Sequence, residues 1–332
     1  MKSYEEFTHF AASRLNSDLE LLQTLREKLV RKLILLRSAL VLMFVGFLGL
    51  MFSFDLFMSD LEDNTFYLVS AVLFVILYIS LFFFIFAKQR KLRAEFVHLF
   101  KSKLINSIVD FFDLGLKYEP SKFISLDDFR RSGLVKNNIK KYYGDDLVEG
   151  KVGKTKIRFS EVHAFIEQSS QDNKKHYVEV FGGIFFIGDF NKNFNGTTYV
   201  MPDKIEKFMG RFAKYIQSFI KVHGQLVKME DIDFENQFTV YSDDQIEARY
   251  ILSTSLMQRI LDFKKKAGSD IMMAFKDSRI YMAIPKQGLL FEPKIFGKLI
   301  AEETLRKYYE DMAIAISSVE ELNLNLRIWG KE

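Results

Sequence analysis

The sequence predicts an α+β protein: an N-terminal transmembrane helical hairpin with a helical stalk, followed by a mixed, mostly antiparallel sheet domain with packed helices. Three observations lead to this fold class. Two lipid-length apolar stretches lie in the N-terminal third, heptad-spaced leucines precede them, and alternating apolar residues begin near Leu147. We therefore expect residues 1–115 to form the hairpin and stalk, and residues 116–332 to form a cytoplasmic domain.

The two apolar stretches are long enough to cross a bilayer. The first covers about residues 33–54 with Arg37 as its only charge, and the second covers residues 65–87 with none. At ~1.5 Å per residue they form helices of roughly 33 and 35 Å, which match a hydrocarbon core of ~30 Å. Two buried soluble helices, or a cleaved signal peptide, would not normally show this length and position.

Basic residues on the outer flanks of the two spans predict their orientation. The connecting loop, residues 55–64, holds four acidic residues and no Lys or Arg. The basic flanks are Arg26, Lys28, Arg31, Lys32 and Arg37 on the first span, and Lys88, Arg90, Lys91 and Arg93 after the second. The positive-inside rule then places both termini in the cytoplasm. The spans hold no buried Asp, Glu, Lys or His, so they are typical of anchors, not of transporters.

Leucines spaced by seven residues predict that the spans continue as helices outside the membrane. Leu15, Leu22, Leu29 and Leu36 share one helical face, and Leu92 to Phe112 show similar spacing. We expect the two helices to pack as an antiparallel stalk. A dimerisation seam is the alternative.

The rest of the chain alternates between strand and helix patterns. A short helix is expected at Leu126–Ser132 with Ser125 as its cap, followed by strands between Leu147 and Met201. The later expected elements are a helix at Asp203–Lys221, a strand at Gln237–Tyr241, helices across Asp243–Lys266, a hairpin around Asp277-Ser278, a helix at about Pro293–Glu320 and a terminal strand near Leu324–Ile328. Ser242 and Gln245 have capping-box spacing, and Gly182-Gly183 indicates a bulge or a close backbone approach.

Composition excludes several classes of function. The chain has no cysteine, which excludes disulfides and thiolate chemistry, and the region after residue 103 is almost neutral, which argues against nucleic-acid binding. The run Gly150–Thr155 ends like a phosphate-binding loop, but the first glycine of that motif is missing and a strand follows, so a hairpin turn at Gly153-Lys154 is expected. The five histidines lack ligand spacing; a site shared by His163 and His176 is a minor alternative. We predict no metal and no cofactor.

Four residues are the first candidates if a dispersed site exists: Glu161, Asp189, Glu247 and Arg249. Their alternative roles are capping and ion pairing. The acidic residues Glu230, Asp231, Asp233 and Glu235 are expected at a solvated edge before a strand.

The chain resembles the bacterial two-span membrane-protein family catalogued as domain of unknown function 3137. Apart from the apolar hairpin, the resemblance is carried by Ser132-Gly133-Leu134, Phe159-Ser160-Glu161, Val180–Phe186, Phe238–Tyr241 with Asp244 and Glu247–Leu252, and Phe291-Glu292-Pro293. It implies topology and fold, and it implies no reaction and no catalytic residue.

Together these observations favour a non-enzymatic accessory protein of the bacterial inner membrane. It would act as a scaffold or assembly chaperone for another membrane protein or complex, such as transport or motility machinery, in contact with membrane lipid. Association with a second copy is left open. The alternative is a membrane-tethered enzyme or sensor with a site in the cytoplasmic domain.

Overall fold

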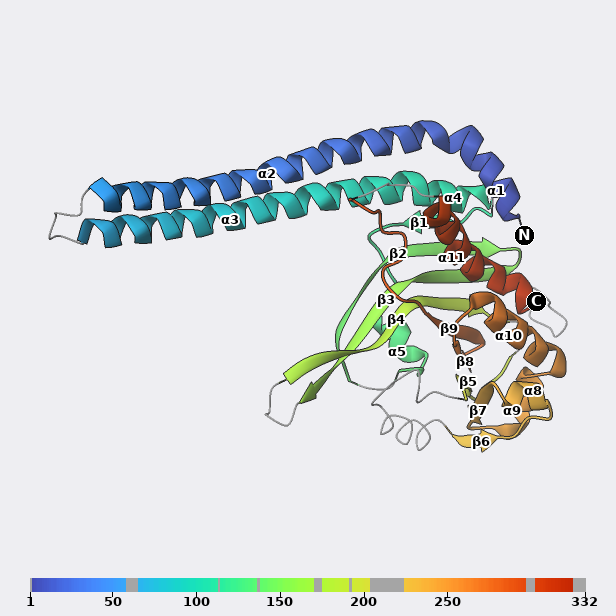
Figure 1. The fold of residues 1–332 in the computed structure, drawn as a ribbon. Helices are drawn as coiled ribbons and strands as arrows, with labels where there is room; N and C mark the ends of the chain where they lie inside the picture. The colour runs from blue at the N-terminus through green and yellow to red at the C-terminus, as the bar shows by residue number, and fades with distance from the viewer. Residues whose placement is uncertain are drawn as a thin grey trace. The chain divides into compact units, whose positions relative to one another are not determined.

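The computed structural model describes residues 2–57, 65–112, 114–135, 138–169, 175–190, 193–203, 224–296 and 302–324 (Figure 1). The chain divides into two compact units. The hairpin unit contains Ser13–Leu104 and Pro293–Ala301, and the sheet unit contains Met1–Ala12, Ile105–Glu292 and Glu302–Glu332.

The hairpin unit consists of two long helices, α2 (Asn16–Phe57) and α3 (Thr65–Phe100), which pack against each other. Both are long and apolar enough to cross a membrane, and only 6% of the most apolar window of each is buried. The ring centroids of Phe47 and Phe74 lie 3.5 Å apart in a stacked pair between the two helices. The predicted hairpin is therefore confirmed as a pair of apolar helices.

The same helices form the predicted stalk. Leu15, Leu22 and Leu29 are buried on one side, as are Phe96 and Phe100 on the other. Lys103 and Asp18, on the two sides, form an ion pair at 2.6 Å. The boundary between the two units falls twice within a π-helical segment, at Ala11–Leu15 and at Lys101–Ile105.

The sheet unit contains a nine-stranded sheet and several helices. Its strands are β1 (Lys117–Glu119), β2 (Ile139–Val152), β3 (Thr155–Ser169), β4 (Lys175–Asp189), β5 (Thr198–Pro202), β6 (Gln225–Val227), β7 (Phe238–Ser242), β8 (Met272–Lys276) and β9 (Arg279–Pro285). Its helices are α1 (Tyr4–Phe10), α4 (Asn106–Phe111), α5 (Leu126–Arg131), α8 (Ile232–Glu235), α9 (Gln245–Ile251), α10 (Thr254–Ala267) and α11 (Glu302–Glu321).

The strands lie in the order β1-β2-β3-β4-β9-β8-β5-β7-β6, and every described pair is antiparallel. The α+β class is therefore confirmed. The predicted two-residue turn at Gly153-Lys154 joins β2 to β3, with Val152 opposite Thr155. The predicted close backbone approach occurs at Gly183, where an added Cβ would collide with the carbonyl oxygen of Ile284.

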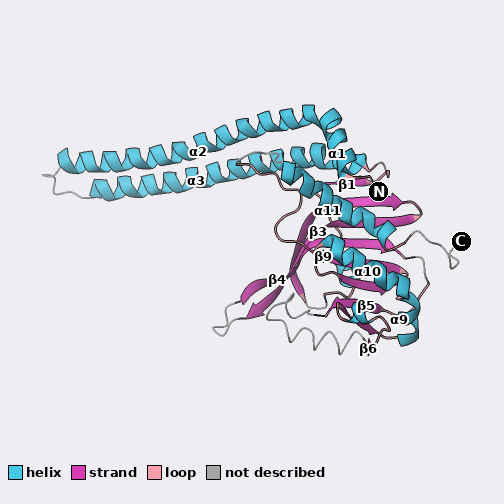
Figure 2. Ribbon diagram, turned by 45° about the vertical axis from the view of Figure 1, so that its right-hand side comes forward, coloured by secondary structure: helices cyan, strands magenta, loops and turns pink. Residues whose placement is uncertain are grey.

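The sheet is covered on both faces. Helices α10 and α11 run side by side along one face (Figure 2). Helix α5 packs on the opposite face, where the ring of Phe129 lies 4.8 Å from that of Phe185. Alternation along each strand explains this arrangement, because Phe185 and Phe186 point to opposite faces and both are buried.

The first residues of the chain belong to the sheet unit. Ser3 caps α1 in a capping box with Glu6, and the fully buried ring of Phe7 stacks on Tyr309 of α11 at 5.1 Å. Lys2 donates a hydrogen bond to the carbonyl of Phe111 at 2.6 Å. Helix α1 therefore closes this end of the core.

Several local predictions differ from the structure. The last helix is described from Glu302 and Pro293–Phe296 are not helical, so the predicted start at Pro293 is wrong. The cap of α9 is Asp244, not Ser242. The predicted helix after Asp203 and the terminal strand after Leu324 lie outside the described residues.

Candidate functional site

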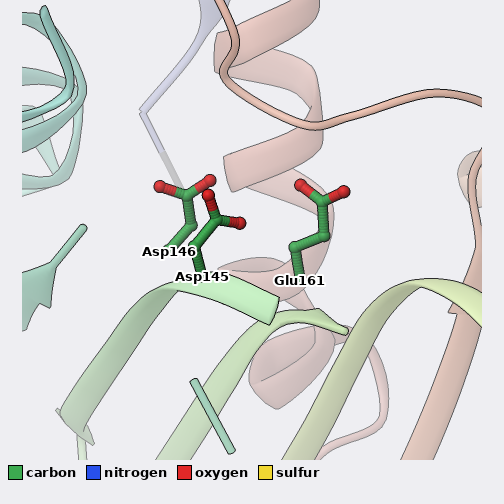
Figure 3. Close-up of side chains that lie close together, drawn as sticks. All are labelled: Asp145, Asp146 and Glu161. Carbon is green, nitrogen blue, oxygen red and sulfur yellow. The ribbon is translucent and has the colours of Figure 1, made fainter. Parts of the chain in front are cut away.

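Three carboxylates gather on β2 and β3. One oxygen from each of Asp145, Asp146 and Glu161 lies within 4.8 Å of the others, and the three side chains project from the same side of the two strands (Figure 3). Asp146 and Glu161 are buried. A regular strand would send Asp145 and Asp146 to opposite faces, but β2 has a register shift between Asp145 and Val148, and Asp146 has φ of 60°.

His163 links Glu161 to a third strand. Its Nε2 lies 2.7 Å from Glu161 Oε1, and its Nδ1 lies 2.5 Å from Glu179 Oε1 on β4. The ring of Tyr143 stacks on the imidazole at 5.1 Å. Gly182, opposite His163 on β4, leaves room for this arrangement, because a Cβ there would lie 2.6 Å from Glu179 Oε1.

Two further protein groups donate hydrogen bonds to the carboxylates. The backbone N–H of Leu290 donates to Glu161 Oε2 at 2.7 Å, and the hydroxyl of Tyr118 donates to Asp146 Oδ1 at 2.5 Å. Carboxylate oxygens are the ligands that Mg²⁺ and Ca²⁺ prefer, but here Asp146 and Glu161 already accept hydrogen bonds from protein groups. The three carboxylates are therefore not assigned as a metal site. The expectation that the protein binds no metal stays a prediction.

Burial perturbs the titration of this network. Burial raises the pKa of Glu161 above its usual value, although hydrogen bonds from His163 and Leu290 act in the other direction. Burial alone would lower the pKa of His163, but its hydrogen bonds to Glu179 and Glu161 outweigh that effect, and the pKa is raised. Both shifts favour the protonated forms of Glu161 and His163.

The four residues singled out in the sequence do not converge. Glu161 belongs to the carboxylate group, whereas Asp189 lies at the end of β4, beside a cavity of about 490 Å³ that Lys156 and Arg279 also line. Glu247 accepts hydrogen bonds from the backbone N–H groups of Asn195 and Gly196, which holds the bend at these two residues. Arg249 donates to the carbonyls of Gln245 and Lys228. Glu247 and Arg249 are thus hydrogen-bonded to backbone groups.

The predicted edge residues have local roles. Asp231 caps α8 through the N–H of Phe234, and Glu235 accepts from the N–H of Met229. The two histidines of the minor alternative lie on neighbouring strands, but His163 is opposite Gly182 and His176 is opposite Gln168, so their side chains are separated along the ladder.

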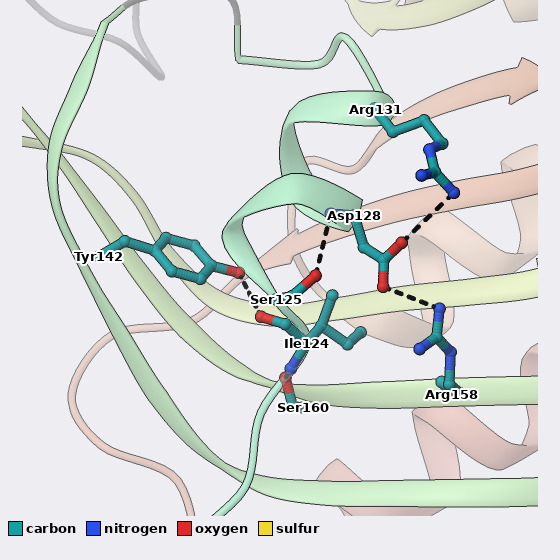
Figure 4. A network of polar contacts seen from close by, with 7 residues as sticks. All are labelled: Ile124, Ser125, Asp128, Arg131, Tyr142, Arg158 and Ser160. Atoms are coloured by element: carbon teal, nitrogen blue, oxygen red, sulfur yellow. Dashed lines mark hydrogen bonds and ion pairs between the residues drawn. The ribbon is translucent and has the colours of Figure 1, made fainter.

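A second polar network attaches α5 to the sheet (Figure 4). Ser125 caps the helix by accepting from Asp128 N, as predicted, and the Asp128 carboxylate pairs with Arg158 of β3 at 3.1 Å and with Arg131 at 3.6 Å. Ser160 accepts a hydrogen bond from the N–H of Ile124 at 3.0 Å. These contacts hold the helix in place.

Sequence reasoning missed Asp145, Asp146, Glu179 and the role of His163. The spacing of Glu161 and His163, two residues apart in an alternating strand, does indicate a shared face. The contributions of β2 and β4 depend on strand order and on the bulge, which local patterns do not contain.

Part of the chain matches a known protein family. Residues 179–324 match the family described as "Protein of unknown function (DUF3137)". The resemblance predicted from the sequence is therefore confirmed over this range, which begins at Glu179 and excludes Glu161. The family description names no activity.

No curated protein matches the chain. Among solved structures, the mycobacterial trehalose monomycolate transport factor A, TtfA, is similar at 11% identity and a TM-score of 0.30, over 64% of this chain and 93% of that one. This likeness is too distant to transfer a role.

Proposed function

We propose that the protein is an accessory protein of the bacterial inner membrane, a non-enzymatic scaffold or assembly chaperone for another membrane protein or complex. The observation that carries the proposal is the exposed apolar surface of the hairpin. Leu73, Phe83 and Phe84 are each more than 60% exposed on α3, and such a surface requires lipid or a protein partner. The two hairpin helices continue directly into the stalk. This continuity is expected of a membrane anchor that carries a soluble domain.

The start of the chain supports a two-pass arrangement with both termini on one side. Residues 1–12 are part of the sheet unit, and so are residues 105–292. A chain that leaves this unit at Ala12 and re-enters it at Ile105 must cross any membrane an even number of times. The basic flanks and the acidic loop then favour the cytoplasm for that side.

Photo-crosslinking in native membranes tests the scaffold function. A photoreactive residue at Phe83 of the hairpin, or at the exposed Tyr177 of β4, should yield defined adducts with another membrane protein. The same residue at Leu33, which is fully buried, is the matched control and should yield none. Deletion of the chain should lower the abundance of the crosslinked partner. A chain that forms no adduct, and whose deletion changes no other membrane protein, would refute the proposal.

The alternative, a membrane-tethered enzyme or sensor, is favoured by one observation. Buried Glu161 and His163 have raised pKa values and are hydrogen-bonded to each other, and His163 also contacts Glu179. A Glu161→Gln variant keeps the shape of the side chain and removes its charge. If the Glu161→Gln variant is as abundant as the wild type but the cells show the phenotype of the deletion, the alternative is favoured. If the variant is as abundant as the wild type and the cells show no such phenotype, the scaffold is favoured.

A further inference from the structure

A groove on the hairpin unit combines a cationic end with an apolar wall. It has a volume of about 380 Å³ and lies between α2 and α3. Its polar lining consists of Arg37, Arg90, Arg93 and Gln89, and its apolar lining consists of Leu40, Phe82, Ile85 and Phe86. All of these residues belong to the same compact unit.

The described residues that line the cationic end include no carboxylate. None of the eight lining residues is Asp or Glu. The guanidinium groups of Arg37 and Arg93 each lie 5.8 Å from the ring centroid of Phe296, so two like charges approach one ring. Arg93 Nε is buried without a hydrogen-bond partner in the described part of the chain. An anion with several acceptor oxygens would reduce the repulsion and supply the missing acceptor.

The apolar wall lies where the uncharged span ends. Phe82 and Phe86 are 45% and 58% exposed, and their rings lie 6.4 Å apart and nearly parallel along α3. The basic segment begins two residues later at Lys88. A ligand that fills the groove must therefore be anionic at one end and apolar at the other.

We propose that this groove binds one anionic phospholipid, with its phosphate at Arg37, Arg90 and Arg93 and an acyl chain along Phe82 and Phe86. The inference rests on the membrane insertion that the proposed function requires. It differs from the general attraction of basic flanks to an anionic leaflet, because it assigns the lipid to three arginines and not to Lys28 and Lys32, which are exposed residues of the same flank.

The test compares two lipids on the full chain, purified in a nonionic detergent and stripped of lipid. Phosphatidylglycerol and phosphatidylcholine are titrated separately, and bound lipid is counted by native mass spectrometry. The wild type should retain phosphatidylglycerol in preference to phosphatidylcholine. R37Q/R93Q should weaken phosphatidylglycerol binding roughly tenfold, whereas the control K28Q/K32Q, with the same change in net charge, should stay within about twofold of the wild type.

Equal binding of the two lipids by the wild type would overturn the inference, and so would equal losses in the two double variants. If R37Q/R93Q loses its helical circular dichroism, the single variant R90Q replaces it, and the single variant K28Q is then its control. A chain that needs detergent but does not distinguish the lipids refutes only the lipid site. A chain that is soluble without detergent refutes the membrane function as well.

Discussion

His163 bridges two carboxylates, and the consequence of removing it can be stated at the scale of the residue. His163→Gln leaves Glu161 buried with a weaker partner, so we expect the free energy of unfolding to fall by about 1–3 kcal/mol. His176→Gln is the control, because that side chain is exposed, and should change stability by less than about 0.5 kcal/mol. Thermal or chemical unfolding of the full chain in detergent measures both. Equal effects would mean that the network is not important for stability.

The same residue predicts how stability depends on pH. The pKa of His163 is raised in the folded state, so its stabilising contribution is fully present below the ordinary value of 6.5 and is lost as pH rises through the folded pKa. The raised pKa of Glu161 acts in the same direction, because stability falls once pH exceeds its ordinary value of 4.5. The stability difference between wild type and H163Q should therefore shrink as the pH rises above 6.5. A difference that grows with pH would contradict the assignment.

Substitutions at Gly183 and Gly268 distinguish the cost of a steric clash from the cost of backbone strain. Both have positive φ, 144° and 61°, but a Cβ at Gly183 would collide with Ile284 O, whereas a Cβ at Gly268 would have no atom within 4 Å. We expect Gly183→Ala to cost roughly 3 kcal/mol or more and Gly268→Ala about 1 kcal/mol. Denaturant titration of the two variants checks the difference. Equal costs would show that the approach of β4 to β9 at this point is not tight.

At the scale of elements, the hairpin, the central strands and α5 could be predicted because their signals are local. The length of the apolar stretches predicted α2 and α3, and the alternation of apolar residues predicted β3 and β4. Ser125 predicted the start of α5. The three-residue strands β1 and β6 have no pattern of their own and exist because a neighbour offers a free edge. The carboxylate group was missed for a related reason, since the bulge at Asp145 and the pairing of β3 with β4 come from the tertiary fold.

Two polar residues before helix α9, Ser242 and Asp244, have different roles. The Asp244 carboxylate accepts from the N–H groups of Ile246 and Glu247. The Ser242 hydroxyl lies 3.0 Å from the carbonyl oxygen of Thr197 and 2.9 Å from that of Asp244, and its single proton is donated to one of them or shared between the two. The spacing of Ser242 and Gln245 matched a capping box, but Ser242 is the last residue of β7 and is held by the sheet.

Asp244→Ala should therefore destabilise the protein by about 1 kcal/mol, and Asp244→Asn by less, because Asn retains an acceptor oxygen. Gln245→Ala serves as the control for the misassigned box and should have an effect of only a few tenths of a kcal/mol. Urea titration followed by far-ultraviolet circular dichroism measures all three. A larger loss for Gln245→Ala than for Asp244→Ala would restore the capping box.

At the scale of the whole molecule, the contacts of the N-terminal helix α1 restrict the possible membrane topologies of the chain. Phe7 packs on Tyr309 and Phe111, and the Tyr309 hydroxyl donates to the carbonyl of Lys2 at 2.7 Å. These contacts tie the segment before the hairpin to a helix near the other end of the chain. Under the proposed two-pass arrangement, we therefore expect α1 and α11 to lie on the same side of the membrane.

The absence of cysteine from the sequence allows a direct test of this topology, because each introduced thiol is the only one present. In spheroplasts, a membrane-impermeant maleimide should label Ser59→Cys, in the loop between the two apolar stretches, without lysis. It should label Lys307→Cys, on the exposed side of α11, only after the membrane is opened. The acidic loop and the basic flanks predict this order of labelling. The opposite order would invert the orientation, and labelling of neither position in intact spheroplasts would show that the loop does not reach the outer side.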